Sequence, residues 1–430
     1  MLKRIDISDL ELGMFVHKLE GSWFKHPFWK SKFLLSDERT LDSLLTSAVP
    51  AVVIDTERGL DVRPSTPRRV SGKAASSTPS GTALRSAVRR SQASRQTLSA
   101  PETSRTTDPE PGSEQQPFSR EFGTARQAAE RSRKLISRVF LEARLGKSIN
   151  AAALAPVVDD IFASVQRNPH AFNGRMRCKR DFEFVYRHAL AVSALMISLG
   201  RQMKLPAKEI KLAGMAGLLI DLGVSHLPCD LASLGGDFRR IEEAVFAEHA
   251  QLGYGLLAAA GLDHEVARAA LEHHERMDGS GYPRGLRGDE IGRFSRMAAI
   301  CDTYDWLVND TLVGAGLDPG AAIAQLRSLA SFFDAEILAA FVDAVGIHPV
   351  GSVVLLSSGR LAMVVEPNLA DPTRPRLRTF WSIRDQRLAP IEEICWAASE
   401  EERIVGTADP EAHGCTCFHG LRERLFTLPG

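Results

Sequence analysis

Between residues 273 and 291 the chain reads His273-His-Glu-Arg-Met-Asp-Gly-Ser-Gly-Tyr-Pro-Arg-Gly-Leu-Arg-Gly-Asp-Glu-Ile291, so that two adjacent histidines precede a loop with four glycines. Glycine permits positive φ angles and a close approach of the backbone to a ligand, and Pro283 stiffens the turn. An interhelical turn is the alternative, but a loop of 14 residues over 278–291 is more than a connection needs. The stretch therefore predicts a binding loop next to two imidazole side chains.

Apolar residues recur at three- and four-residue spacing on both sides of this stretch, from about residue 120 to about residue 335. This spacing is typical of amphipathic helices, and no alternation typical of strands interrupts it. Pro206, Pro228 and Gly261 mark places where helices end. The sequence predicts an all-α domain of about eight helices, over residues 122–145, 152–165, 184–199, 207–222, 241–260, 263–275, 293–308 and 318–333.

The chain before the helical domain divides into two parts. Residues 1–66 contain two runs typical of strands, at 2–7 and 50–55, and a segment at 36–45 typical of a helix with a serine N-cap, which predicts a small α+β domain. Residues 67–117 have almost no large apolar residues, so we expect a disordered linker. The linker has eight basic and four acidic residues, so contact with an anionic partner is an alternative role for it. Five aromatic residues of the first part form either a core or a docking surface: Trp23, Phe24, Phe28, Trp29 and Phe33.

The pattern changes again after the helical domain, which we place at 118–345. Apolar runs at 350–356 and 361–366 predict a hairpin and residues 378–383 a third strand, so we expect a small β unit over 346–400 and a tail over 401–430. The tail contains His413-Gly-Cys-Thr-Cys-Phe-His419, four soft ligands within seven residues. Two to four residues usually separate the cysteines of a structural zinc site, so we expect reduced, metal-free thiols, with zinc as the alternative.

Composition excludes several classes of protein. Lys and Arg total 53 and Asp and Glu total 53, so the chain lacks the basic excess that phosphate binding by nucleic-acid-binding proteins requires. No run approaches the ~20 apolar residues of a membrane-spanning helix. The first 15 residues lack the basic start and apolar run of a secretory signal. We therefore expect a cytoplasmic protein with no nucleic-acid partner and no membrane span.

Histidines and aspartates within the predicted helices are candidates for a metal site. Imidazole and carboxylate together suit manganese, iron or zinc, and a helical bundle can direct such groups to one interior point. Each residue taken alone has a structural alternative, as a core histidine or a helix-end aspartate. The candidate ligands are His188, Asp221, His249, His273, His274 and Asp302.

The stretch at 273–291 resembles the signature of HD-GYP domains, bacterial phosphodiesterases that open the signalling dinucleotide cyclic di-GMP. The resemblance extends from about residue 120 to about 335, and the segments 1–66 and after 349 resemble the flanking parts of one subgroup. It implies a mainly α, HD-type fold. It also implies that the six candidate ligands hold one or two divalent ions, iron or manganese, and that Asp221 is catalytic. The loop that would bind substrate or a partner, such as a diguanylate cyclase domain, contains Asp278, Gly279, Gly281, Tyr282, Pro283 and Gly285.

The chain departs from the HD-GYP pattern at its centre. The His-Asp pair of the family is Ile220-Asp221 here, and isoleucine has no lone pair to offer a metal ion. Val224 stands where the resemblance implies a lysine, and Thr311 where it implies a phosphate-binding arginine. A threonine hydroxyl cannot replace the bidentate, charged contact of a guanidinium.

Two further positions bear on the metal site. The subgroup with a third ion has a glutamate where this chain has Phe184, and Glu183 is one residue away, about 100° around the helix. His226, five residues after Asp221, is a candidate replacement ligand.

The resemblance and the departures leave two functions open. One is a metal-dependent phosphodiesterase that hydrolyses cyclic di-GMP with weak activity, because a lost charge contact commonly costs ~10²–10³ in rate. The other is a catalytically inactive regulatory or protein-interaction module that holds one ion or none. A generic HD-fold nucleotide hydrolase is a third idea, which the glycine-rich loop disfavours. Metal content separates the first two, since a working site should hold about two ions per chain.

Overall fold

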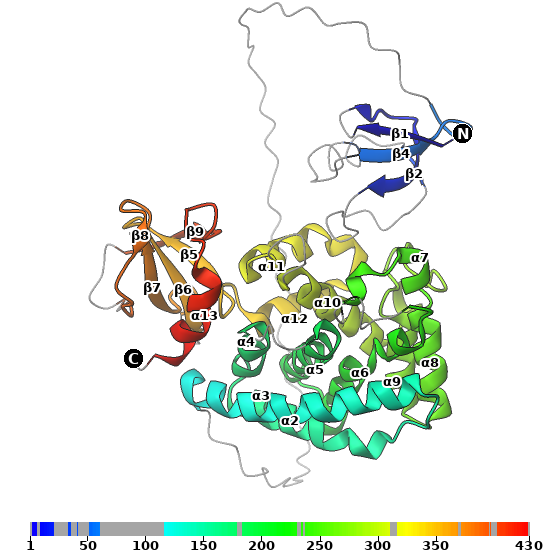
Figure 1. Cartoon of the computed structure of the whole chain (residues 1–430), viewed down its shortest axis with the longest axis horizontal. Coiled ribbons are helices and arrows are strands. Elements are labelled where there is room, and N and C mark those ends of the chain that lie inside the picture. The colour runs from blue at the N-terminus through cyan, green and yellow to red at the C-terminus, as the bar shows by residue number, and fades with distance from the viewer. Residues whose placement is uncertain are drawn as a thin grey trace, which may run out of the picture.

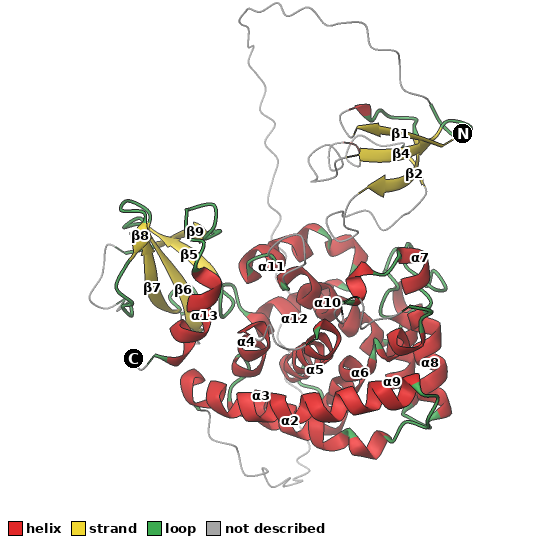
Figure 2. Ribbon diagram, in the orientation of Figure 1, coloured by secondary structure: helices red, strands yellow, loops and turns green. Residues whose placement is uncertain are grey.

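The computed structural model of the 430-residue chain describes residues 2–6, 9–20, 33–35, 41, 51–60, 116–178, 183–229, 234, 237–309, 316–368, 371–394, 396 and 402–428. Within these residues, helices occupy the middle of the chain and strands its two ends (Figures 1 and 2). Several expectations lie outside the described residues: the helix over 36–45, the aromatic residues at 23–29, nearly all of the linker, and the position of Thr311.

The N-terminal part forms a small antiparallel sheet. Its strands are β1 (Leu2–Asp6), β2 (Phe15–Glu20), β3 (Phe33–Leu34) and β4 (Ala51–Asp55), in the order β1-β4-β2-β3. The side chains of Val16 on β2 and of Val52 and Ile54 on β4 are completely buried. The two strands expected from the sequence are β1 and β4.

The middle of the chain is helical, as expected, with α5 in its interior. Fifteen of the 19 residues of α5 are buried, because the helix packs against α2, α3, α4, α6, α10 and α12. The helices are α2 (Phe118–Arg144), α3 (Ala155–Arg167), α4 (Ala171–Cys178), α5 (Phe184–Gln202), α6 (Ala207–Leu219), α7 (Glu243–Phe246), α8 (His249–Ala259), α9 (His264–Glu272), α10 (Arg293–Val308), α11 (Pro319–Ser328) and α12 (Ala335–Val345). None of these described helices combines the length and the apolarity needed to cross a bilayer.

Two of the expected helices are interrupted at candidate ligands. The helix expected over 207–222 ends at Leu219, and a 3₁₀ turn, η4 (Leu222–His226), follows Asp221. The helix expected over 241–260 divides into α7 and α8, and His249 is the first residue of α8. The helices α4 and α12 were not predicted individually.

The C-terminal unit is a five-stranded antiparallel sheet with one helix. The sheet contains β5 (Val353–Leu356), β6 (Arg360–Glu366), β7 (Arg376–Ser382), β8 (Arg387–Leu388) and β9 (Ile404–Thr407), in the order β8-β7-β6-β5-β9, and α13 (Phe418–Thr427) follows. The sequence separated a tail at 401–430 from the β unit, whereas β9 pairs with β5 inside the sheet. Four residues with alternating half-buried and exposed side chains are too short a pattern to recognise before the pairing is known.

Helix α13 attaches this unit to the helical domain. The ring of Phe426 lies 5.0 Å from that of Phe118 and 5.2 Å from that of Phe122, both on α2. Arg175 of α4, whose side chain is 2% exposed, pairs with Glu423 of α13 at 2.5 Å. The C-terminal unit therefore shares an apolar core with the helical domain.

A buried carboxylate fastens α2 to α3. Glu121 is fully buried and accepts hydrogen bonds from Ser164 Oγ at 2.6 Å and from Arg167 Nε at 2.6 Å. Removing one partner of such a pair leaves an uncompensated charge in the interior.

We expect Glu121→Ala to lower the free energy of unfolding by about 3 kcal/mol, because Arg167 and Ser164 lose their acceptor. Glu142→Ala on the same helix is the matched control. Glu142 pairs with Arg138, whose side chain is 75% exposed, so its loss should cost less than about 0.5 kcal/mol. Urea denaturation of the full chain measures both, and equal effects would contradict the prediction.

Candidate metal centre

The six candidate ligands come together inside the helical domain. They arrive from α5, the turn after α6, the start of α8, the end of α9 and α10, and none is more than 4% exposed. Their donor atoms form two groups of three, each within 4.8 Å. One group is His188, Asp221 and Asp302, and the other is His249, His273 and His274.

Asp221 belongs to the first group and also faces the histidines of the second. Its Oδ2 is 3.2 Å from His188 Nε2, and its Oδ1 is 3.4 Å from His249 Nε2 and 3.7 Å from His273 Nε2. Each carboxylate oxygen therefore faces a different group, an arrangement that allows one carboxylate to bridge two cations.

The backbone fixes the orientation of two imidazoles. His249 Nδ1 lies 2.5 Å from the carbonyl oxygen of Phe246, and His273 Nδ1 lies 3.0 Å from that of Ala270. A carbonyl only accepts, so each Nδ1 carries the hydrogen and each Nε2 presents a lone pair. The two Nε2 atoms are 3.2 Å apart, and two lone pairs at that distance fit a shared cation.

His188 is surrounded by carboxylates. Its Nδ1 contacts Asp305 Oδ2 at 2.8 Å and its Nε2 contacts Asp302 Oδ1 at 3.0 Å. Asn309 Nδ2 donates to Asp305 Oδ2 at 2.8 Å and holds it in place. A carboxylate behind a metal-ligating histidine is a common means of orienting the ring. Asp305 was not among the candidate residues, although its position three residues after Asp302 places both on one helix face.

The protonation of two of the imidazoles agrees with a metal site. Burial lowers the pKa of His249 to about 4 and that of His274 well below its usual value, so both are neutral at pH 7, as ligands must be. Burial alone would also lower the pKa of His188, but hydrogen bonds with Asp221 and two other carboxylates raise it well above 6.5. Burial would raise the pKa of Asp221, and its bonds with His188 and His273 lower it instead. Buried carboxylates around one imidazole attract a proton or a cation, and these oxygen and nitrogen donors suit manganese, iron or zinc.

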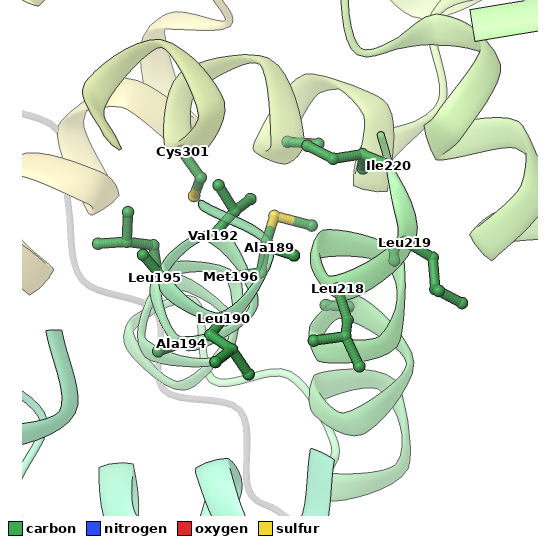
Figure 3. Close-up of a cluster of buried hydrophobic side chains, with 14 of the residues drawn as sticks. Ala189, Leu190, Val192, Ala194, Leu195, Met196, Leu218, Leu219, Ile220 and Cys301 are labelled. Atoms are coloured by element: carbon green, nitrogen blue, oxygen red, sulfur yellow. The ribbon is translucent and has the colours of Figure 1, made fainter. Parts of the chain in front are cut away.

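Two of the positions where the chain departs from the HD-GYP pattern are apolar and buried. Ile220 is 1% exposed and Val224 is 2% exposed, and both belong to the core of the helical domain. Figure 3 shows Ile220 in a cluster with Val192 and Met196 of α5. His226 does not belong to either group of three ligands, and its Nδ1 lies 3.1 Å from Ser225 Oγ.

An aromatic side chain, Phe184, packs on the ring of His188. The Phe184 ring stacks on the His188 ring, with centroids 5.3 Å apart and an interplanar angle of 17°. The guanidinium of Arg239 lies 3.7 Å from the centre of the Phe184 ring and pairs with Asp237 at 2.7 Å. At the position where the resemblance to one subgroup implies a glutamate, the chain thus has an aromatic ring with a guanidinium over it. Nothing in the sequence pattern indicated Arg239.

The glycine-rich loop is fastened against the centre. The buried carboxylate of Glu275 accepts hydrogen bonds from the backbone N–H groups of Arg284 at 2.7 Å and Leu286 at 3.0 Å. The Tyr282 ring stacks on His274, with centroids 4.7 Å apart. A Cβ at Gly281 would lie 2.3 Å from the carbonyl oxygen of His274, so only glycine allows this approach.

The remaining loop residues shape its turns. Gly279 and Gly285 adopt φ angles of +77° and +67°, which favour glycine. Asp278 Oδ1 accepts a hydrogen bond from the backbone N–H of Ser280 at 2.9 Å, and the Tyr282-Pro283 peptide bond is cis. The loop residues named from the sequence thus belong to one folded segment, which contacts His274 at Gly281 and Tyr282.

A close contact between η4 and α8 sets the positions of Asp221 and His249. A Cβ built on Gly223 would lie 2.0 Å from the carbonyl oxygen of His249 and 2.5 Å from the backbone nitrogen of Gly253. Neither neighbour is a flexible side chain, so the backbone itself would have to move.

We expect Gly223→Ala to lower the free energy of unfolding by about 2 kcal/mol or more, because it separates η4 from α8. Gly255→Ala is the matched control on α8, where a Cβ meets nothing within 4 Å. A helix gains about 0.5–1 kcal/mol from that exchange. Opposite signs of the two changes in urea denaturation are the expected result, and a neutral Gly223→Ala would contradict it.

Comparison with protein families gives two matches. Residues 2–154 match a domain of unknown function (DUF3391), and residues 164–337 match the HD domain.

Known proteins with similar sequences are phosphodiesterases. The chain is 36% identical over 415 residues to the cyclic di-GMP phosphodiesterase PA4108 of Pseudomonas aeruginosa, covering 96% of this chain and 93% of that protein. It is 24% identical over 190 residues to the cyclic di-GMP phosphodiesterase PdeB of Borreliella burgdorferi, covering 44% of this chain and 50% of that protein. It is 32% identical over 125 residues to the 3'3'-cGAMP-specific phosphodiesterase 1 of Vibrio cholerae, covering 29% of each.

Proposed function

This chain belongs to the HD-GYP family, and from that premise we propose that its helical domain is a metal-dependent phosphodiesterase that hydrolyses cyclic di-GMP. The observation that carries the proposal is the carboxylate of Asp221, with one oxygen facing each of two buried groups of ligands. Two adjacent groups that share a carboxylate are the arrangement that two-metal hydrolases use.

The donors assign a role to each group. His188, Asp221 and Asp302 would hold one divalent ion, and His249, His273 and His274 the other, with iron or manganese favoured by the mixed nitrogen and oxygen donors. Bound ions supply positive charge for the phosphate oxygens and lower the pKa of a bound water toward 7.

Other residues of the chain fix the orientation of the histidine ligands. Asp305 and Phe184 fix the ring of His188, the Phe246 carbonyl fixes His249, and the Ala270 carbonyl fixes His273. Because these contacts set the lone pairs in place before anything binds, little reorganisation is needed at the moment of reaction.

The loop that follows the histidines is the proposed substrate side of the centre. Tyr282 lies on His274, and Glu275 holds the loop closed around that contact. A relative that matches nearly the whole chain is named for cyclic di-GMP, which favours that dinucleotide over 3'3'-cGAMP. Hydrolysis of an intracellular signal would place the protein in the cytoplasm.

We expect the purified full chain to hydrolyse cyclic di-GMP anaerobically with Fe(II) or Mn(II), and Asp221→Asn to reduce the rate by at least ~10². The variant loses the charge that faces both groups, so its metal content should also fall. Asp159→Asn is the control, because Asp159 lies on α3, outside the centre and the loop, and its side chain is 56% exposed. A folded wild-type chain without turnover, with metal bound or not, would refute the phosphodiesterase proposal.

The second candidate is an inactive module that binds a partner, and one observation favours it. Ile220 takes the place of a family ligand and packs into the core, so the group around His188 has three protein donors and no histidine at position 220. In that role the exposed side of the loop, at Arg284 and Arg287, would be the contact surface for a partner such as a diguanylate cyclase domain.

Restoring the missing donor distinguishes the two candidates. If the wild-type rate is limited by Ile220, Ile220→His should raise metal content and increase kcat/KM on the order of 10², as a supporting ligand contact is worth. Ile220→Val is the control, since it keeps the position apolar. Equal metal content and equal rates in the two variants would show that position 220 does not limit the centre.

A further inference from the structure

The C-terminal unit contains a pair of thiols that the proposed hydrolase does not use. Cys415 and Cys417 lie in the turn before α13, and Cys417 is the N-cap residue of that helix. Their Sγ atoms are 3.7 Å apart. Cys415 is fully buried in an apolar cluster, whereas Cys417 is exposed. One sulfur is therefore open to solvent and the other lies directly behind it.

The two sulfurs have no further potential metal ligand grouped with them in the part of the chain that the structure describes. Within the described residues, the groups of three potential ligands are the two at the candidate metal centre, and neither includes Cys415 or Cys417. His419 Nε2 lies 3.9 Å from Glu411 Oε1, and the backbone oxygen of His413 accepts from Trp381 Nε1. A tetrahedral zinc site needs four ligands, so the two sulfurs alone do not make one.

We infer that Cys415 and Cys417 form a peroxide-reactive dithiol, a modification site that closes to an intrachain disulfide. Cys417 sulfur attacks an oxygen of the peroxide, so an S–O bond forms, the O–O bond breaks, and water leaves after taking the thiol proton. Cys415 sulfur then attacks Cys417 sulfur, the S–S bond forms, the S–O bond breaks, and a second water leaves with the proton of Cys415. Two thiols lose two electrons while hydrogen peroxide becomes two waters.

The surroundings give the two sulfurs different roles. Cys417 is accessible to the oxidant and sits at the N-terminal end of α13, where the helix dipole stabilises negative charge. Burial, followed by the hydrogen bond to Cys417, raises the pKa of the Cys415 thiol to about 11. Cys417 is therefore the sulfur that the oxidant meets, and Cys415 is the resolving thiol.

The site lies at one end of the helix that holds the C-terminal unit in place. Glu423 of α13 pairs with Arg175 of α4, and Phe426 packs on Phe118 of α2. A disulfide between Cys415 and Cys417 changes the backbone at the start of α13. The exchange rate of the α13 amide hydrogens is therefore a second readout, besides the mass of the oxidised chain.

The experiment treats the reduced full-length chain with hydrogen peroxide, alkylates the remaining thiols, and maps the products by mass spectrometry. The mass of the wild-type chain should fall by two hydrogen atoms, and the disulfide should map between Cys415 and Cys417. Dithiothreitol should restore both thiols. Cys417→Ser should leave Cys415 reduced. Cys415→Ser should trap a sulfenic acid on Cys417 that reacts with dimedone. Cys301, which is buried, is the internal control.

Three outcomes would overturn the inference. They are sulfinic acid on Cys417 with Cys415 still reduced, a link from either residue to Cys178, or zinc that copurifies with the wild-type chain and is absent from Cys417→Ser. None of these measurements involves cyclic di-GMP or the metal centre, so the result stands apart from that of the proposed hydrolase.

Discussion

The buried carboxylate of Asp221 is the constraint on which the helical domain depends. A charge in an apolar interior is costly unless partners surround it, and here imidazole nitrogens from α5, α8 and the end of α9 provide them. Each imidazole in turn needs a partner for its other nitrogen, which Asp305 and two backbone carbonyls supply. The helices are thus bound to one another through a polar centre as well as through their apolar faces.

The same region shows how closely core and site are joined. Ile220 precedes Asp221 in the chain, yet its side chain packs with the residues of α5 while Asp221 faces the histidines (Figure 3). Full burial of such a side chain contributes about 1.5–3 kcal/mol, so an apolar residue at this position satisfies the fold. Stability and ligand number are therefore separable here, and a chain can keep the HD-type architecture with one donor fewer. Phe184 is a second example, because its ring packs between the His188 ring and the Arg239 guanidinium at a position where the resemblance implies a glutamate ligand.

The ends of the chain are tied to the helical domain to different degrees in what the structure describes. The C-terminal sheet and α13 share a core with α2 and α4, through Phe426 and through the buried Arg175. The N-terminal sheet has a core of its own, formed by Val16, Val52 and Ile54 among others. The C-terminal unit is therefore positioned by the same packing that positions the helices, which gives chemistry at α13 a physical route to the rest of the domain.

The sequence by itself determined the mainly α class and most helix positions, because these depend on local periodicity. Its resemblance to a family, carried by a loop motif with few alternatives, named the six candidate ligands. It also identified Ile220 and Val224 as departures. Only the tertiary structure decided that Asp221 lies between two groups of ligands, that Asp305 and Arg239 support His188, and that β9 and α13 belong to the C-terminal unit. These features join residues far apart in the chain, such as His188 and Asp305, or β5 and β9. Their partners are set by packing in three dimensions, and no local pattern in the sequence carries that information.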